Sequence, residues 1–212
     1  MMNKFEIICS IVEFANIEFI RLKNMYNLDD SVTFNVPMIR EYMANEYDNR
    51  YKHNCDCVQS VMTEIVNDYL LEESFIFTKY DEYDGKVFYR IVLPKYHISE
   101  VLFGSSIELV KKYITVILMH EIGHVLHVKD IIARYGDKAE EYLINEDQEF
   151  FEKWSESIKP YEEDDSITEA EYQRICISNY YKFGAEIEAN RLAGVNVNDL
   201  IDLELKVRLG YE

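Results

Sequence analysis

The chain of 212 residues contains little proline, glycine or tryptophan, with 3, 7 and 1 residues of these types. So few prolines and glycines leave little room for long loops or flexible linkers. Hydrophobic residues make up 48% of the sequence, which is enough to fill one substantial core. A second domain in a chain of this length would be cramped. We therefore predict a single domain over residues 1–212.

Basic residues are scarce as well. The chain has 22 lysines and arginines against 40 aspartates and glutamates, so its formal net charge is −18 at pH 7. Such a surface repels polyanions, which argues against nucleic acid or an anionic membrane as a direct partner. The negative charge favours a neutral or basic partner, or it serves solubility alone.

The four cysteines have no disulfide-framework spacing. Cys55 and Cys57 are too close together for a zinc knuckle, and Cys9 and Cys176 stand alone. We therefore expect reduced thiols and a cytoplasmic location. The sequence also lacks an apolar run of the roughly eighteen residues that a membrane span needs, and its N-terminus does not read as a signal peptide.

One short string of the sequence carries strong chemical meaning, His120-Glu-Ile-Gly-His124. On a helix, positions four apart lie on one face, so both imidazoles can bind a single Zn²⁺ ion. Glu121 directly follows the first of them, which places its carboxylate beside the ion as a general base toward a water molecule. The string therefore predicts a hydrolytic zinc centre, provided that it lies on a helix and that a third ligand exists.

The surrounding residues favour a buried helix over residues 105–135. Ser105 can cap its start, with Glu108 at the third position of a capping box. The run Tyr113–Met119 is apolar nearly all round, as expected inside a core. A pair of purely structural histidines is the alternative. Ordinary core helices rarely place ionisable groups where their apolar run ends, because burying them unpaired is unfavourable.

The third ligand must come from a distant part of the chain, and residues 184–193 are the best source. Glu186 and Asn190 are four residues apart, so on a helix they share a face. This spacing suits a ligand carboxylate and an amide that orients a metal-bound imidazole through its other nitrogen. Glu188 points about 200° away on the same helix, so only one of the two glutamates can reach the ion, and we prefer Glu186. An amphipathic helix with two solvated glutamates is the alternative.

The stretch His120–His127, taken with Glu186–Ala193, resembles the ImmA/IrrE-type metallopeptidase domain. The pattern of that family is His-Glu-Leu-Gly-His-x-x-x-His with a downstream Glu-x-Glu-Ala-Asn-x-Phe-Ala. More broadly the chain looks like a gluzincin, a zinc peptidase in which two histidines and a downstream glutamate bind the metal. The resemblance implies that the ligands are His120, His124 and Glu186, that the general base is Glu121 and that the orienting residue is Asn190.

The gap from His124 to Glu186 is longer than this family's pattern leads us to expect, which implies an insertion. We place it at residues 137–167, with an acidic helix over 137–158 that Pro160 ends. The insertion either covers the cleft or forms a passive surface helix.

The rest of the chain predicts an α+β fold that is mostly helical, with a small antiparallel sheet before the metal helix. Two β-branched and aromatic runs flank the turn signal Asp84-Gly85, which indicates a hairpin. Zincin-like peptidases carry such a sheet just before the metal helix. The predicted segments are N-terminal helices within 1–73 (over 3–26, 37–47 and 55–73), a hairpin at 74–94, and C-terminal helices within 168–209. Thr168 and Glu171 cap the first of the C-terminal helices, and we expect this same helix to continue far enough to carry Glu186.

These residues lead to the hypothesis of a zinc-dependent peptidase that hydrolyses a peptide bond in a protein or peptide substrate. The resemblance implies a regulatory substrate, such as a repressor protein of a phage or mobile element. Two alternatives are a non-catalytic zinc-stabilised binding module or antirepressor, and a metallotoxin. Tyrosines and His127 are available to stabilise the oxyanion, but the sequence selects none of them, and we take His127 to be structural. The oligomeric state is left open.

Overall fold

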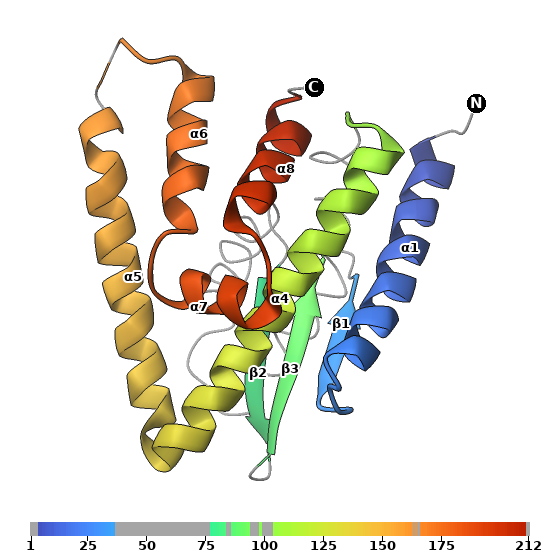
Figure 1. The fold of residues 1–212 in the computed structure, drawn as a ribbon, viewed down its shortest axis with the longest axis vertical. Helices are drawn as coiled ribbons and strands as arrows, with labels where there is room; N and C mark the ends of the chain where they lie inside the picture. Colours follow the sequence, from blue (N-terminus) through green and yellow to red (C-terminus); the bar gives the residue numbers. More distant parts are fainter. Residues whose placement is uncertain are drawn as a thin grey trace, which may run out of the picture. The chain divides into compact units, whose positions relative to one another are not determined.

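The computed structural model describes residues 4–36, 77–83, 86–93, 98, 104–162, 164 and 166–210. The chain divides into two compact units, Met1–Ile107 and Glu108–Glu212. Figure 1 shows a mostly helical chain with one small sheet, so the prediction of an α+β fold is confirmed at this level. The prediction of a single domain stays a prediction. The features expected at 37–47, at 55–73, at Cys55 and Cys57 and at Asp84-Gly85 lie outside the described residues.

A three-stranded sheet lies in the first unit. Strands β2 (Phe77–Tyr83) and β3 (Lys86–Val92) pair antiparallel, which confirms the predicted hairpin. Strand β1 (Val32–Asn35) adds to the other edge of β3 in parallel, so the strand order is β1-β3-β2. The prediction of a purely antiparallel sheet is therefore wrong, because the sheet is mixed.

The sequence pattern does not reveal β1 for two physical reasons. A strand of four residues is too short for a period-two alternation to be distinct. Its parallel partner also lies far along the chain, since parallel pairing requires a long crossover connection. Backbone hydrogen bonds flank the pair, from Tyr89 N–H to Ser31 O at 2.8 Å and from Leu93 N–H to Asn35 O at 2.9 Å.

Helix α1 (Lys4–Met25) agrees with the helix predicted over 3–26. The Phe19 ring stacks on Phe34 of β1, with ring centroids 5.3 Å apart. Lys23 Nζ donates to Val32 O at 3.1 Å. These contacts attach α1 to the sheet through its buried residues, which recur at helical spacing at Ile11, Ala15, Phe19 and Leu22.

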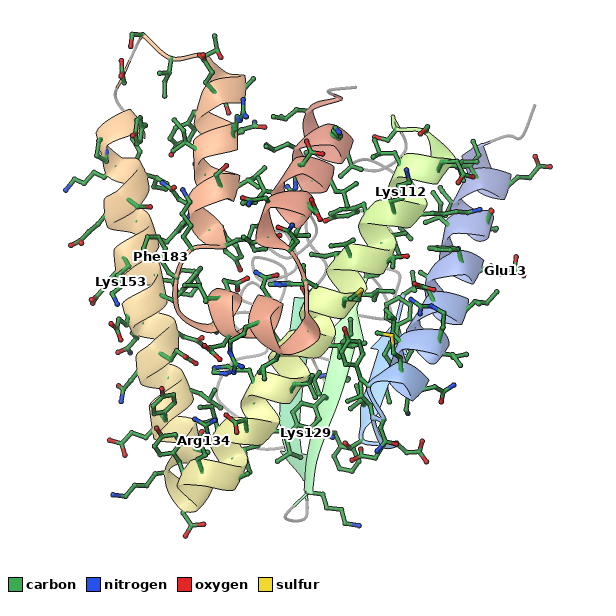
Figure 2. The ribbon with its side chains drawn as sticks, in the orientation of Figure 1. Glu13, Lys112, Lys129, Arg134, Lys153 and Phe183 are labelled. Atoms are coloured by element: carbon green, nitrogen blue, oxygen red, sulfur yellow. The ribbon has the colours of Figure 1, made fainter. Side chains whose placement is uncertain are left out.

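Helix α4 (Ile107–Tyr135) forms the start of the second unit and agrees with the predicted metal helix apart from a start two residues later. Gly136, which directly follows the predicted end of this helix at residue 135, has φ +53°, in the left-handed region that glycine adopts without strain. It opens the one-turn helix η2 (Gly136–Lys138). Lys112 and Arg134 project from the exposed side of α4 (Figure 2).

Helix α5 (Ala139–Glu162) is longer than predicted. The expectation that Pro160 ends it is wrong, because Pro160 lies inside the helix. In the last turn a proline removes one hydrogen bond without dividing the helix, and Pro160 is exposed. Trp154 Nε1 donates to Cys176 O at 3.2 Å, and α5 packs along both following helices.

Helix α6 (Glu169–Tyr180) begins with the predicted capping box, in which Thr168 accepts from the backbone N–H of Glu171 and the Glu171 side chain accepts in return. The prediction that this helix continues to Glu186 is wrong. The chain turns after Tyr180, and a separate helix, α7 (Gly184–Ala193), begins at a glycine with φ +47°. A left-handed residue cannot continue a right-handed helix, so this turn gives α7 its own direction.

Helix α8 (Val197–Leu209) completes the unit, with Asn196 as its N-cap. It packs against α6, and α5 packs against α6 and α7, as the neighbouring ribbons in Figure 1 show. None of the helices in the described ranges has both the length and the hydropathy that crossing a membrane requires.

Candidate metal centre

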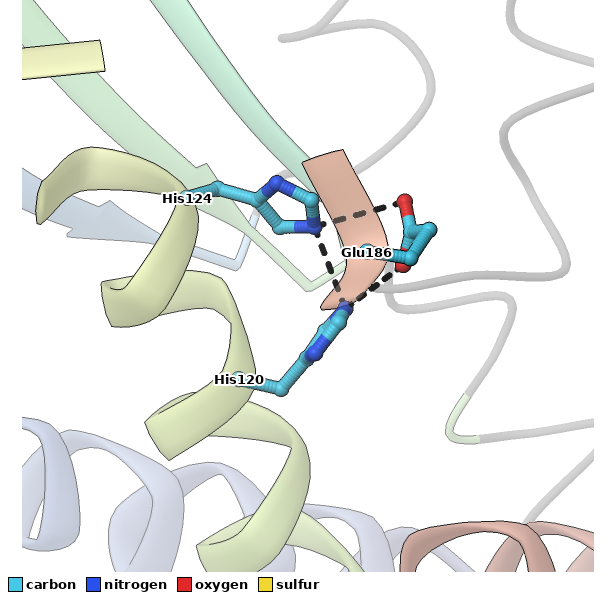
Figure 3. Close-up of side chains that lie close together, drawn as sticks. All are labelled: His120, His124 and Glu186. Carbon is cyan, nitrogen blue, oxygen red and sulfur yellow. Dashed lines mark hydrogen bonds and ion pairs between the residues drawn. The ribbon is translucent and has the colours of Figure 1, made fainter. Parts of the chain in front are cut away.

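Three side chains of the second unit converge on one point. His120 and His124 lie one turn apart on α4, and Glu186 reaches them from α7 (Figure 3). His120 Nε2 lies 3.0 Å from Glu186 Oε2 and 3.1 Å from His124 Nε2, and His124 Nε2 lies 3.5 Å from Glu186 Oε1. The side chains of His120, His124 and Glu186 are 3%, 20% and 7% exposed, so the cluster is buried and most open at His124.

The close approach of α4 and α7 depends on Gly123. A Cβ atom at this position would lie 2.1 Å from Ala189 O and 2.6 Å from Ala189 C, far inside contact distance. Only glycine allows the two helix backbones to meet here. Gly123 directly precedes His124 on α4, and Ala189 follows Glu186 by three residues on α7. Sequence reasoning assigned no role to Gly123. The sequence could have indicated this role, because Gly123 lies inside a long predicted helix. A glycine there lowers helix stability by about 1 kcal/mol relative to alanine, so its presence calls for a packing reason.

Asn190 sets the tautomer of His120. The Asn190 Nδ2 group donates to Glu186 O at 2.8 Å, which fixes the orientation of the amide. Its Oδ1 atom therefore faces His120 Nδ1 at 3.0 Å and accepts a hydrogen bond from it. With the proton of the neutral ring on Nδ1, the lone pair of Nε2 points into the cluster, as a metal ligand requires.

Glu186 Oε2 is buried and has no hydrogen-bond partner among the described residues. It faces the Nε2 lone pair of His120, and two acceptors 3.0 Å apart repel unless a cation lies between them. Ligand atoms bound tetrahedrally at zinc–nitrogen and zinc–oxygen distances are about 3.3 Å apart, which is close to the separations observed here. The three ligand atoms lie within 4.8 Å of one another, so this buried group can hold a metal ion.

Without a metal, a proton takes the place of the cation. Burial by itself lowers the pKa of His120, but the hydrogen bond and negative charge of Glu186 outweigh it and raise that pKa to about 9. Burial by itself raises the pKa of Glu186, yet the two imidazoles hold it well below its usual range. A metal ion that binds here therefore has to displace a proton from His120.

The opposite pKa shifts of His120 and Glu186 predict how the stability of the metal-free protein depends on pH. The folded pKa of His120, about 9, lies above its ordinary value of 6.5, so the protonated ring stabilises the fold fully below pH 6.5. That contribution is lost as the pH rises through about 9. The pKa of Glu186 is lowered from 4.5, so its contribution is present above pH 4.5 and lost below. Urea unfolding in chelator should show stability declining from pH 6.5 to 9.

The matched control for this pH dependence is His120→Gln, which keeps a side chain able to hydrogen-bond but removes the titrating ring. The decline should be smaller in this variant, and excess zinc should remove it from the wild type because the ion replaces the proton. An equal decline in both proteins would contradict the assignment of the raised pKa to His120.

Two neighbouring tyrosines reach the cluster, Tyr180 at the end of α6 and Tyr181 directly after it, and sequence reasoning singled out neither. The Tyr181 ring lies edge-to-face against His120, with centroids 5.3 Å apart and an interplanar angle of 87°. The Tyr180 side chain lies near the Glu186 carboxylate, and burial together with the charge of Glu186 raises the pKa of Tyr180 well above its usual range. With 17 tyrosines in the chain, no local signal separates these two from the rest.

The remaining candidates from the sequence lie as follows. Glu121 is buried on α4, close enough to act electrostatically on His120. Glu188 lies outside the cluster and forms an ion pair with Arg191 at 2.6 Å. His127 also lies outside it, since its Nε2 atom pairs with Glu146 Oε2 of α5 at 2.7 Å. The structure thus brings Glu186 to the two histidines and not Glu188.

Comparisons with protein-family models, with curated proteins and with solved structures each find no match to this chain. The functional conclusion therefore rests on the geometry of the cluster and on the residues around it.

Proposed function

We propose that this chain is a zinc-dependent peptidase whose metal is held by His120, His124 and Glu186. The observation that carries the proposal is the convergence of three atoms of metal-binding types, one of them a buried carboxylate oxygen without a hydrogen-bond partner among the described residues. The buried Glu121 follows the first histidine and is close enough for its charge to act on that ring. If these three side chains bound zinc, they would leave its fourth tetrahedral position open, which is the arrangement of catalytic rather than structural zinc.

The donor set supports zinc as the metal. Two imidazoles and one carboxylate are common zinc ligands, and Asn190 orients one imidazole through its other nitrogen. The same donor types also bind ferrous iron in oxygenases, so metal analysis belongs to the test. When bound, the ion would polarise a substrate carbonyl and lower the pKa of a water molecule.

The chain's own groups would supply the remaining chemistry. Glu121 follows His120 on the same helix, and in this proposal its carboxylate accepts a proton from the attacking water and returns it to the leaving amine. The Tyr180 phenol keeps its proton, because burial and Glu186 raise its pKa. Its single O–H can therefore donate to only one acceptor at a time, either the Glu186 carboxylate or negative charge that develops beside it.

The likeness of His120–His127 and Glu186–Ala193 to the ImmA/IrrE-type pattern supports placing this chain among zincin-like peptidases of the gluzincin kind. On that basis we propose a cytoplasmic enzyme whose substrate is a regulatory protein, such as a phage or mobile-element repressor. The net charge of −18 supports a protein or peptide substrate over nucleic acid.

The test compares the full chain with Glu121→Gln. Both proteins are analysed for bound metal by mass spectrometry and then incubated with a library of unstructured peptides, in which cleavage is read as new N-termini. We expect one zinc per chain in both proteins. The wild type should cleave and lose activity in chelator, while the variant should be slower by about 10²–10⁴-fold, the usual effect of losing a general base.

A Glu121→Gln variant that cleaves at the wild-type rate would disprove the role of this carboxylate. Zinc binding by a wild type that cleaves no peptide would favour a non-catalytic binding module or antirepressor instead. Cleavage confined to host proteins would favour a metallotoxin, and bound iron without hydrolysis would exclude the peptidase.

A further inference from the structure

His120 contacts a second group of buried polar side chains, which comes from the α6–α7 turn and from α8. The Tyr181 ring packs edge-to-face on the imidazole. The Tyr181 hydroxyl donates to Glu204 Oε2 of α8, and Glu204 Oε1 pairs with Arg208 Nε at 2.8 Å, one turn further along that helix. Tyr181 and Glu204 are both buried. The chain of contacts therefore runs from the last helix to the first histidine of the metal cluster.

Glu204 is an unusual residue for the buried side of a helix, because a carboxylate in the interior is unfavourable unless its oxygens are paired. Here both oxygens have partners, the phenol on one side and the guanidinium on the other. An apolar residue would fill the same space without this requirement. What the carboxylate adds is a strong, directional acceptor that fixes the Tyr181 hydroxyl, since hydrogen bonds to an ionised group are short and strong.

A fixed Tyr181 supplies a constraint that Asn190 does not. The hydrogen bond from His120 Nδ1 to Asn190 Oδ1 sets the tautomer and one edge of the ring. It leaves the ring able to tilt about the axis of that bond. The edge-to-face contact with Tyr181 opposes this tilt, and such ring pairs contribute beyond their buried area. Together the two contacts fix both the direction and the plane of the Nε2 lone pair.

We infer that Tyr181, held by Glu204 and Arg208, is a positioning residue that presets the plane of the His120 imidazole for metal binding. This inference rests on the proposed metal centre. It predicts that α8, which contributes none of the three ligands, influences metal affinity through the tyrosine.

The test measures Co²⁺ binding to the full chain, with the visible absorption of the ion as a signature of its ligand geometry. Tyr181→Leu removes the ring, Tyr181→Phe keeps the ring but loses the bond to Glu204, and Leu200→Ala is the control. Leu200 is fully buried on α8, one turn before Glu204, and none of the contacts named above involves its side chain. Its truncation therefore lowers stability without removing any of these contacts.

We expect Tyr181→Leu to bind Co²⁺ about 10–100-fold more weakly, as is usual for loss of a group that orients a ligand, and with an altered absorption spectrum. Tyr181→Phe should show a smaller loss, of about threefold to tenfold, because its ring is retained but less firmly held. Leu200→Ala should lower the unfolding temperature and leave the cobalt affinity and spectrum unchanged. If Tyr181→Leu does not fold, the affinity of Tyr181→Phe decides the question.

Wild-type affinity and spectrum in every folded Tyr181 variant would overturn the positioning role while leaving the metal centre intact. An equal loss of affinity in Leu200→Ala and Tyr181→Leu would also overturn it, because the loss would then follow stability. A wild type that binds neither Co²⁺ nor Zn²⁺ would overturn the proposed function together with this inference.

Discussion

Replacing Gly123 by alanine is expected to destabilise the second unit by at least about 2 kcal/mol and to abolish tight metal binding. The new Cβ would lie 2.1 Å from Ala189 O, so α4 and α7 would have to separate. Overpacking a core costs about 1–3 kcal/mol when side chains can adjust, and backbone atoms cannot adjust, which puts the penalty at about 3 kcal/mol or more. The higher helix propensity of alanine returns only about 1 kcal/mol.

The loss of metal binding follows from the same displacement. Glu186 lies on α7 only three residues before Ala189, so moving this helix moves the third ligand away from both histidines. Urea unfolding in chelator measures the free energy of unfolding, and competition with a chromophoric chelator measures the zinc dissociation constant.

Gly104→Ala is the matched control, since a Cβ atom there would meet nothing within 4 Å. It should change stability by no more than about 0.5 kcal/mol. Ala189→Gly added to Gly123→Ala should not restore binding, because the obstructing atoms belong to the backbone of Ala189. A stable Gly123→Ala protein with wild-type zinc affinity would show that the two helices do not meet as described.

Two glutamates on α7 should differ sharply in their effect on zinc. Glu186→Ala removes the only carboxylate of the cluster and leaves two imidazoles. Loss of an orienting partner costs about 10–100-fold in metal affinity, so loss of a ligand should cost more than about 100-fold. Chelator competition at pH 7.5 gives the dissociation constants of the wild type and the variant.

Glu188→Ala is the control for this prediction, on the same helix and two residues away. Glu188 pairs with Arg191 at 2.6 Å, and its side chain is 39% exposed. An exposed ion pair contributes about 1 kcal/mol or less, so this variant should fold normally and bind zinc as the wild type does. A larger loss of affinity in Glu188→Ala than in Glu186→Ala would exchange the two assignments.

Local patterns in the sequence were enough to predict several elements. The apolar run before His120 and the glycine after Tyr135 predict α4 to within two residues at its start. The capping box of Thr168 and Glu171 marks the start of α6. In each case the signal lies within a few residues of the feature, because helix periodicity, caps and left-handed glycines are local properties of the backbone.

Other features depend on segments that meet only in the folded chain. The turn at Gly184 separates α7 from α6, and the contact at Gly123 then carries Glu186 to the histidines. The parallel strand β1 and the contacts of Tyr181 with Glu204 likewise join residues that no local period connects.

The sequence by itself therefore determined which residues have the chemistry to bind a metal, the helix that carries two of them and the carboxylate beside them. The tertiary structure decided which distant glutamate completes the cluster, the tautomer of His120 and the side chains that hold its ring. The physical reason is the separation along the chain of the residues that are in contact. Spacing along a helix fixes neighbours one turn apart, whereas contacts across 70 residues, such as that of His120 with Asn190, depend on how closely two backbones can approach.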